Sequence, residues 1–322
     1  MTLDTAEGRT GRRKGLRALG VRLGDRPAFI AALGALCIAS SAILVRLADT
    51  GPVTVAVYRC VLALPVLGLI AHLESARLGP LPRRARTLAW IAGVFFAADL
   101  IFWHNAIEAV GAGLATVLGN LQVLLVGFAA WALLGERPRA TLFWALPVVV
   151  SGVVLISGVT GGDTYGEDPA LGVLLGIATS IAYAAFILIL RHGSQDLARV
   201  AGPLTHATFA AAVCTIGYGM VTGEVDWTPG WASIGWVAVL ALTAQVAGWL
   251  LISRSLPRLP AAITSVILLL QPVGALGLAA VVLGERPGPA QLAGAALILA
   301  GVIVATAGHR ARASAPEPRP AV

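Results

Sequence analysis

Two charged side chains, Arg59 and Asp99, lie deep within long apolar stretches of the sequence. An ionisable group near the middle of a bilayer costs at least about 2.5–3.5 kcal/mol, so such a group indicates function by default. At a rise of about 1.5 Å per residue, Arg59 lies about 10 Å and Asp99 about 12 Å from the same end of their predicted helices. We therefore expect the two to meet as an intramembrane pair. Arg59 would then attract a substrate carboxylate and Asp99 an amine or a proton. The alternative is a static ion pair that holds two helices together.

Aromatic side chains accompany the predicted acid. Trp103 follows Asp99 by four residues, so both lie on one face of a helix. A ring beside a carboxylate suits a cationic or zwitterionic solute, although Trp103 could equally be an interfacial anchor. His104 comes next and could titrate near neutral pH, which makes Asp99 and His104 candidates for proton coupling. A packing histidine is the alternative for His104. Tyr183 and Trp249 also lie in apolar runs and are further candidates for substrate binding.

Two glutamines are related by an internal repeat. The pentapeptide LGERP at 134–138 returns at 283–287, 149 residues later, and the same offset relates Gln122 to Gln271. Each glutamine lies about 15–16 Å into its predicted helix, near the midplane of a bilayer. Two amides at equivalent central positions could bind a substrate. The alternative is a helix–helix hydrogen bond, worth about 0.6 kcal/mol in membranes.

These side chains need helices that cross a membrane. The chain has 322 residues, of which 57% are hydrophobic and 12% charged. That charged fraction is about half of the ~25% typical of soluble domains. Apolar runs of about 20 residues separated by short polar breaks predict an all-α polytopic membrane protein. The ten predicted transmembrane helices are 27–48, 52–73, 87–107, 112–134, 140–159, 170–190, 204–222, 231–253, 260–283 and 289–308.

Charge fixes the predicted orientation. The net charge is +7, but 20 of the 23 Lys and Arg residues fall in the termini and in loops on one side of the membrane. This is the positive-inside pattern, so we expect a multi-pass protein of the plasma (inner) membrane with cytoplasmic termini and no nucleic-acid partner. On the predicted external side the basic residues are Arg46 and Arg286.

The repeat and the orientation together predict two inverted halves, because each half holds five helices. The predicted organisation is a basic cytoplasmic segment (1–26), a first five-helix repeat (27–159), an external linker (160–169), a second repeat (170–308) and a disordered cytoplasmic tail (309–322). Inverted repeats are typical of secondary transporters, whose substrate site lies near the midplane. Gly172, Gly176 and Ser180 give one helix a small-residue face, either for internal packing or for a homodimer.

Glu136 and Glu285 occupy equivalent positions in the repeated pentapeptide, yet the inverted arrangement puts them on opposite sides of the membrane. They cannot share one site. Each lies in a tight turn, where its carboxylate could accept backbone N–H bonds or meet the following arginine. We therefore interpret both as structural turn residues.

Other classes of protein lack support in the sequence. It has no G-x-x-x-x-G-K-[ST], H-E-x-x-H or G-x-S-x-G motif, and its five histidines show no ligand spacing. We therefore expect no enzyme activity, no metal and no other cofactor. A channel is a further alternative, but no filter motif is present. Cys37, Cys60 and Cys214 lie in apolar runs and are interpreted as small hydrophobic residues.

Several short motifs resemble a known family. In the first half they are Asn105-Ala106-Ile107, Gly111-Ala112-Gly113, the Gly-Glu-Arg-Pro turn and Gly152-Val153; in the second they are Leu256, Pro260-Ala261-Ala262, Gln271-Pro272-Val273, Gly284-Glu285-Arg286 and Gly294 with Gly301-Val302. Over residues 28–308 the chain resembles the EamA-type permeases of the drug/metabolite transporter superfamily.

The resemblance implies a bundle of two inverted five-helix repeats around a central cavity. It also implies export of amino acids or other small metabolites. With the pseudo-symmetric halves, which favour alternating access, we expect a secondary active exporter of such a metabolite or a drug, and proton coupling through Asp99 and His104 is a hypothesis from those two side chains. In one respect the chain departs from the family. Val123 stands where the second half has Pro272, so no proline kinks the first-half helix there.

Overall fold

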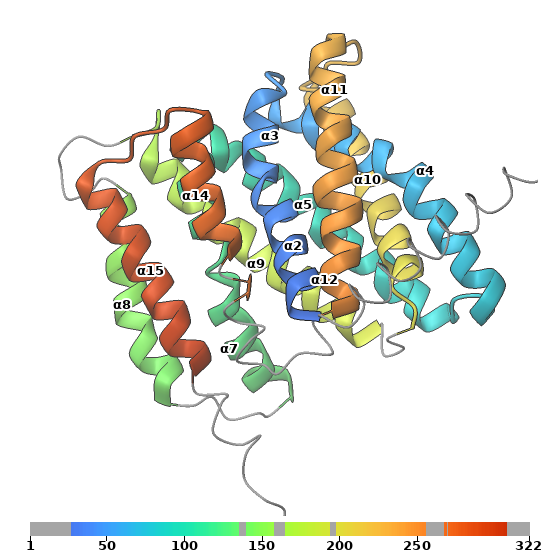
Figure 1. Cartoon of the computed structure of the whole chain (residues 1–322), viewed down its shortest axis with the longest axis horizontal. Helices are drawn as coiled ribbons and strands as arrows, with labels where there is room; N and C mark the ends of the chain where they lie inside the picture. The colour runs from blue at the N-terminus through green and yellow to red at the C-terminus, as the bar shows by residue number, and fades with distance from the viewer. Residues whose placement is uncertain are drawn as a thin grey trace, which may run out of the picture.

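The computed structural model describes residues 27–134, 140–157, 165–193, 198–255, 267–268 and 270–307. In these residues all regular secondary structure is helical (Figure 1). The first repeat comprises α2 (Pro27–Ala39), α3 (Ser41–Leu47), α4 (Pro52–Leu78), α5 (Arg83–Val110), α6 (Ala112–Gly119), α7 (Gln122–Leu134) and α8 (Ala140–Ile156). The second comprises α9 (Pro169–Gly193), α10 (Ala201–Thr222), α11 (Trp231–Leu240), the π-helix η1 (Ala241–Gly248), α12 (Trp249–Ser255), α14 (Leu270–Val282) and α15 (Pro289–Ala307).

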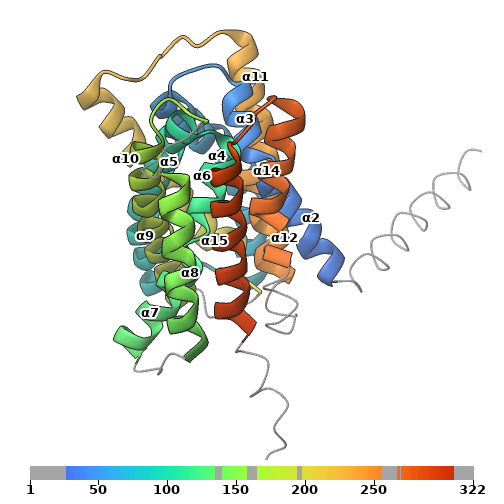
Figure 2. The same cartoon turned by 90° about the vertical axis from the view of Figure 1, so that its left-hand side faces the viewer.

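The helices confirm the predicted fold class. Six described helical segments are long and apolar enough to cross a membrane, and four shorter apolar helices accompany them. Their order follows the ten predicted spans, so the chain is an all-α polytopic membrane protein built from two inverted five-helix repeats. Helix α2 begins and α15 ends at the same end of the bundle (Figures 1 and 2). We call this the terminal end and the opposite one the far end.

Two of the spans are broken near their middle. Between α2 and α3 the hydroxyl of Ser40 donates to the Cys37 carbonyl (2.8 Å), and that of Ser41 donates to the Ile38 carbonyl (2.6 Å). Such local bonds compete with regular helix geometry. Between α6 and α7 the chain turns at Asn120, whose side-chain amide donates to the Thr116 carbonyl (2.8 Å). This span is therefore broken without a proline.

Close packing of glycines holds several helices together. Helices α8 and α15 lie side by side at one edge of the bundle (Figures 1 and 2). A Cβ on Gly152 would lie 2.6 Å from the Gly294 carbonyl oxygen, and a Cβ on Gly294 would lie 2.6 Å from that of Gly152. The two backbones are therefore in contact, as small residues permit in membranes.

The small-residue face of α9 is used inside the protein. A Cβ on Gly176 would lie 2.6 Å from Leu118 Cβ, and the hydroxyl of Ser180 donates to the Leu118 carbonyl (2.9 Å). Gly172 similarly packs against Val110. This face of α9 therefore positions α6, which contributes residues to the central cavity.

Helices α4 and α10 are joined at both ends of the bundle. At the terminal end the Glu74 carboxylate accepts hydrogen bonds from the backbone N–H groups of Val200 (2.7 Å) and Gly202 (2.7 Å). A carboxylate is stabilising at a helix N-terminus. At the far end the Asp226 N–H donates to the Thr54 hydroxyl (2.9 Å). These bonds fix the helix that carries Arg59.

Candidate functional site

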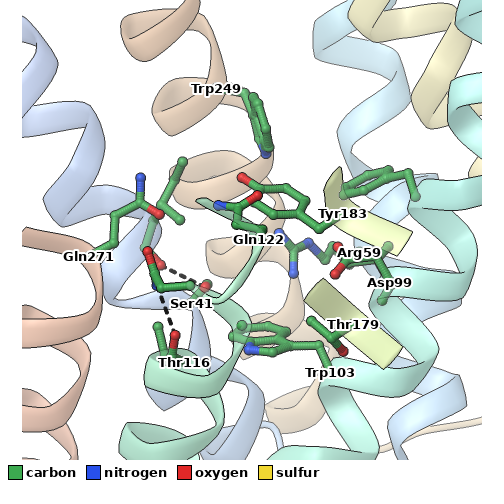
Figure 3. A pocket seen from close by; sticks show the side chains of 15 residues that line it. Ser41, Arg59, Asp99, Trp103, Thr116, Gln122, Thr179, Tyr183, Trp249 and Gln271 are labelled. Atoms are coloured by element: carbon green, nitrogen blue, oxygen red, sulfur yellow. Dashed lines mark hydrogen bonds between the residues drawn. The ribbon is translucent and has the colours of Figure 1, made fainter. Parts of the chain in front are cut away.

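A cavity lies between the two repeats near the middle of the bundle (Figure 3). It contains about 570 Å³ of empty space, including its open part. The breaks of two spans open onto it, which is how discontinuous helices build sites in transporters. Its lining residues come from nine helices and one helix break: Ile38, Ser41, Arg59, Phe96, Asp99, Leu100, Trp103, Thr116, Gly119, Asn120, Gln122, Thr179, Tyr183, Trp249 and Gln271.

Arg59 is held at the wall of the cavity by a glutamine from the other repeat. Its side chain is only 4% exposed, and its Nε donates to Gln245 Oε1 (3.2 Å). Gln245 lies in the π-helix η1, is fully buried, and donates through Nε2 to the Thr208 hydroxyl (3.1 Å). The guanidinium carbon also lies 5.9 Å from the centre of the Trp103 ring. Among the described residues Arg59 Nη1 has no hydrogen-bond partner, so part of the guanidinium is unused.

Asp99 lines the same cavity but does not pair with Arg59. No salt bridge joins the two in the described part of the chain, so the predicted direct ion pair is not formed in this structure. Nor does the Asp99 carboxylate, 7% exposed, have a hydrogen-bond partner among the described residues. Arg59 and Asp99 lie next to each other at the cavity wall in Figure 3, but no hydrogen bond or salt bridge joins these two side chains.

Both repeat-related glutamines reach the cavity, on α7 and α14. Gln122 Oε1 is buried and has no hydrogen-bond partner in the described part of the chain, and the same is true of the Thr179 hydroxyl on the facing helix α9. Figure 3 shows Gln271 on one side of the cavity and Asp99 on the other. Buried polar atoms without partners are rare in native proteins, so each needs an explanation.

Aromatic rings form the apolar wall. Tyr183 and Trp249 meet edge to face, with ring centres 5.9 Å apart. Phe186 packs behind them, 5.4 Å from Trp249 and 4.7 Å from Phe96. Trp103 lines the cavity below Arg59 in Figure 3. The predicted candidates Trp103, Tyr183 and Trp249 thus lie together with Arg59.

His104 lies elsewhere. It lines a second pocket at the far end, together with Arg46, Asp49 and Glu108. Its ring is fully buried beside the Pro52 carbonyl, and no well-formed hydrogen bond reaches either ring nitrogen from the described residues. The ring centres of Trp103 and His104 are 5.3 Å apart, so these neighbours separate the two pockets.

Glu285 joins the two repeats at the far end. Its carboxylate is 3% exposed and accepts hydrogen bonds from the backbone N–H groups of Ala112 (2.7 Å) and Gly113 (3.1 Å). A turn of the second repeat therefore caps helix α6 of the first repeat rather than the helix that follows it. Glu136 lies outside the described residues.

Three polar lining residues, Thr116, Asn120 and Thr179, are not singled out by the sequence reasoning. Asn120 could have been found, because an asparagine in the middle of an apolar run is costly unless it is bonded or functional. Thr116 and Thr179 leave no such signal, since threonine is common in transmembrane helices and bonds its own backbone. The Thr116 hydroxyl does this, donating to the Ala112 carbonyl (2.8 Å).

The chain is similar to known proteins in sequence and in fold. The model of the EamA-like transporter family matches residues 26–158 and again 170–307. A relative, the uncharacterized transporter YwfM of Bacillus subtilis (strain 168), is 23% identical over 231 residues, which are 71% of this chain and 76% of that protein. One solved crystal structure, of a protein whose name gives no function, superposes with a TM-score of 0.58 at 18% identity, covering 89% of this chain and 98% of that one. At this identity the structural likeness shows the fold alone.

Proposed function

Because the chain belongs to the EamA-like transporter family, we propose that this membrane transporter carries a small zwitterionic solute, an amino acid or a related amphiphilic metabolite or drug. It does so as a secondary active exporter, by alternating access through the central cavity. The observation that carries the proposal is the set of charged and polar groups that face this cavity without partners.

The unpaired groups match the two ends of an α-amino acid. Arg59 offers unused N–H donors, which suit a carboxylate because guanidinium and carboxylate bond as two parallel forks. Asp99 and the Gln122 amide oxygen offer acceptors for an ammonium group. Leaving a buried polar group unpaired costs about 1–3 kcal/mol, and a bound solute would remove that cost.

The apolar wall supports a solute that also has a hydrocarbon part. Tyr183, Trp249 and Trp103 surround the polar groups, and ligand pockets generally combine such a wall with few polar contacts. Gln271 completes the cavity from the second repeat, so a bound solute would touch both halves. Such contact with both halves is what alternating access requires of a midplane site.

The orientation and the coupling belong to the same proposal. The excess of Lys and Arg in the termini and in the loops of that side supports a cytoplasmic terminal end in the inner membrane. We assign export as the direction of transport because the permeases that the sequence resembles usually export their substrates. Asp99 and His104 would carry the coupled proton, because both are ionisable and lie within the membrane-spanning part of α5.

Counterflow in proteoliposomes tests the proposal. Vesicles loaded with unlabelled L-leucine should take up radiolabelled L-leucine transiently, whereas a channel would not exchange and an enzyme would yield product. L-leucine methyl ester lacks the carboxylate and isocaproate lacks the ammonium group, so neither should support exchange. A thermal-shift panel of amino acids selects the best probe first, because a solute at about 100 times its Kd stabilises by about 2.7 kcal/mol.

Matched variants locate the site. Arg59→Gln and Asp99→Asn should abolish counterflow. Arg286→Gln and Glu224→Gln make the same chemical changes at exposed far-end positions and should leave it intact. Equal exchange by the Arg59→Gln and Arg286→Gln proteins would contradict the role of the cavity.

A further inference from the structure

A second pocket opens at the far end of the bundle, outside the central cavity. It contains about 640 Å³ of empty space and lies between the end of α3, the 49–51 turn, the start of α4 and the last turns of α5. Its charged side chains are Arg46, Asp49 and Glu108, and His104 lines it as well. None of these residues lines the central cavity.

The most informative group in this pocket is His104. Its ring is fully buried, and the Pro52 carbonyl beside it makes no well-formed hydrogen bond with Nδ1 or Nε2; no other described residue bonds either nitrogen. A buried imidazole normally makes at least one good hydrogen bond, so this poor geometry calls for an explanation. A ligand in the pocket that His104 lines supplies one.

The charged side chains of the pocket are also unused. Arg46, Asp49 and Glu108 are exposed, and within the described part of the chain no hydrogen bond or salt bridge occupies their charged groups. Arg46 is one of two basic residues on the predicted external side, where the positive-inside rule disfavours arginine. A static ion pair with Glu108 would explain why an arginine occurs on this side, but Arg46 and Glu108 form no such pair.

The chemistry of this pocket repeats that of the central cavity. Each has one guanidinium, at least one carboxylate and a ring side chain without a competing salt bridge. Arg46 can bind a carboxylate, Asp49 and Glu108 can bind an ammonium group, and His104 can donate to or accept from either end. We propose that this far-end pocket is a second binding site for the same zwitterionic solute, in series with the central cavity.

The position of the two pockets supports a serial arrangement. Trp103 lines the central cavity and His104 lines the far-end pocket, and their ring centres are 5.3 Å apart. A solute that leaves the central cavity toward the far end passes this pair of rings and reaches Arg46 and Glu108. The inference rests on the proposed function, because it assigns the same solute to both pockets.

Binding stoichiometry tests the inference. Equilibrium dialysis of radiolabelled L-leucine against the purified full-length chain should give two molecules per chain. Arg46→Gln and Glu108→Gln should each reduce this to one, and Arg59→Gln should also leave one. The double variant Arg46→Gln, Arg59→Gln should bind none, whereas Arg286→Gln should keep both.

The outcomes separate this inference from the proposed function. One molecule per chain, lost in Arg59→Gln and kept in Arg46→Gln, overturns the second site and leaves the proposed function intact. No binding by the wild-type chain overturns both for this class of solute. Arg46 and Glu108 are exposed, so their variants should fold; size-exclusion chromatography checks this.

A labelling experiment tests the far-end pocket without measuring binding stoichiometry. Thr50 lines the far-end pocket, so a Thr50→Cys variant, with the three native cysteines replaced by alanine, reports its occupancy through reaction with a maleimide. L-leucine should slow this reaction at least several-fold, and the protection should persist when Arg59→Gln is added. An unchanged rate in both backgrounds overturns the inference.

Discussion

Replacing Glu285 with glutamine should weaken the contact between the two repeats at the far end. The carboxylate is buried and accepts hydrogen bonds from the N–H groups of Ala112 (2.7 Å) and Gly113 (3.1 Å) at the start of α6. Glutamine has nearly the same shape, but only its amide oxygen accepts. One of the two buried N–H groups therefore loses its acceptor, and the charge at the helix N-terminus disappears.

The magnitude follows from these two losses. A hydrogen bond to a charged group contributes about 1.5–3 kcal/mol, and its loss leaves a buried donor unpaired. A negative charge at a helix N-terminus contributes about 0.3–1 kcal/mol more. We therefore expect Glu285→Gln to lower the free energy of unfolding by about 2–4 kcal/mol. At about 2 °C per kcal/mol for a large domain, Tm should fall by roughly 4–8 °C.

Thermal unfolding in detergent measures this effect, at one scan rate for all variants because membrane proteins often unfold irreversibly. Glu224→Gln is the matched control, because Glu224 is exposed at the same end of the bundle. Glu285→Ala should cost at least as much as Glu285→Gln, since alanine accepts from neither N–H group. If Glu285→Gln and Glu224→Gln unfold within a degree of each other, the far-end contact contributes nothing and the argument from the two hydrogen bonds is refuted.

Three further predictions concern the neighbourhood of this contact and of Arg59. Gly111→Ala should destabilise the protein by about 1–3 kcal/mol in the same thermal assay, because φ is +88° there and a Cβ would lie 2.7 Å from the Tyr165 ring. Gln245→Leu should weaken L-leucine binding about tenfold in dialysis, since Arg59 loses the acceptor that orients its fork, worth about 1.4 kcal/mol. Burial and then the nearby Glu285 raise the pKa of Tyr165 above 10.0, and Arg46 has the opposite effect. Glu285→Gln should therefore lower the pKa of Tyr165. An ultraviolet difference titration, with Tyr165→Phe as the reference, measures this pKa.

Each of these three predictions has a control variant or an outcome that would contradict it. Gly68→Ala, at a helical glycine with open space around it, should not destabilise the protein, so equal losses at Gly68 and Gly111 would contradict the steric argument. Unchanged affinity in Gln245→Leu would remove the positioning role of Gln245. A raised pKa in the folded state favours the neutral phenol of Tyr165, so its contribution to stability is full below the unfolded pKa and is lost as pH rises through the folded pKa. A higher Tyr165 pKa in Glu285→Gln would contradict the assigned cause.

The fold was largely predictable, because a span needs about 20 apolar residues and the repeat supplies the pairing of the halves. The 149-residue offset identified Gln122 and Gln271 as equivalent, and both line the central cavity. The Arg59–Asp99 pair failed for a physical reason. Residue counting gives depth along the helix but not the direction of the side chain or what lies between two groups.

Local geometry explains the other differences. The Gln245 side chain accepts a hydrogen bond from Arg59 Nε, and Gln245 lies in a π-helix. The apolar periodicity of the sequence does not reveal a π-helix. His104 is next to Trp103, and at 3.6 residues per turn adjacent side chains point about 100° apart. They therefore line different pockets. The turn containing Glu285 was predicted, but its partner, α6 of the other repeat, depends on tertiary packing.

The asymmetry of the cavity bears on how a solute could drive the conformational change. Arg59 and Asp99 both belong to the first repeat, and Thr208 stands 149 residues after Arg59, at the equivalent position of the second. Gln245 bonds both Arg59 and Thr208, so this amide already links the equivalent helices α4 and α10, which are also tied at their ends. These helices therefore form a fixed frame, and Gln122 and Gln271 lie on helices outside it.

A solute shifts a conformational equilibrium only if it binds the two conformations with different affinities. A zwitterion held by Arg59 and Asp99 can favour one state through contacts with groups outside this frame, and Gln122 and Gln271 are the repeat-related polar pair among them. We therefore expect the Gln122→Leu, Gln271→Leu double variant to bind L-leucine in the central cavity but to exchange it slowly, whereas Arg59→Gln loses binding in that cavity. Loss of both activities in the double variant would instead place the amides among the groups that determine affinity.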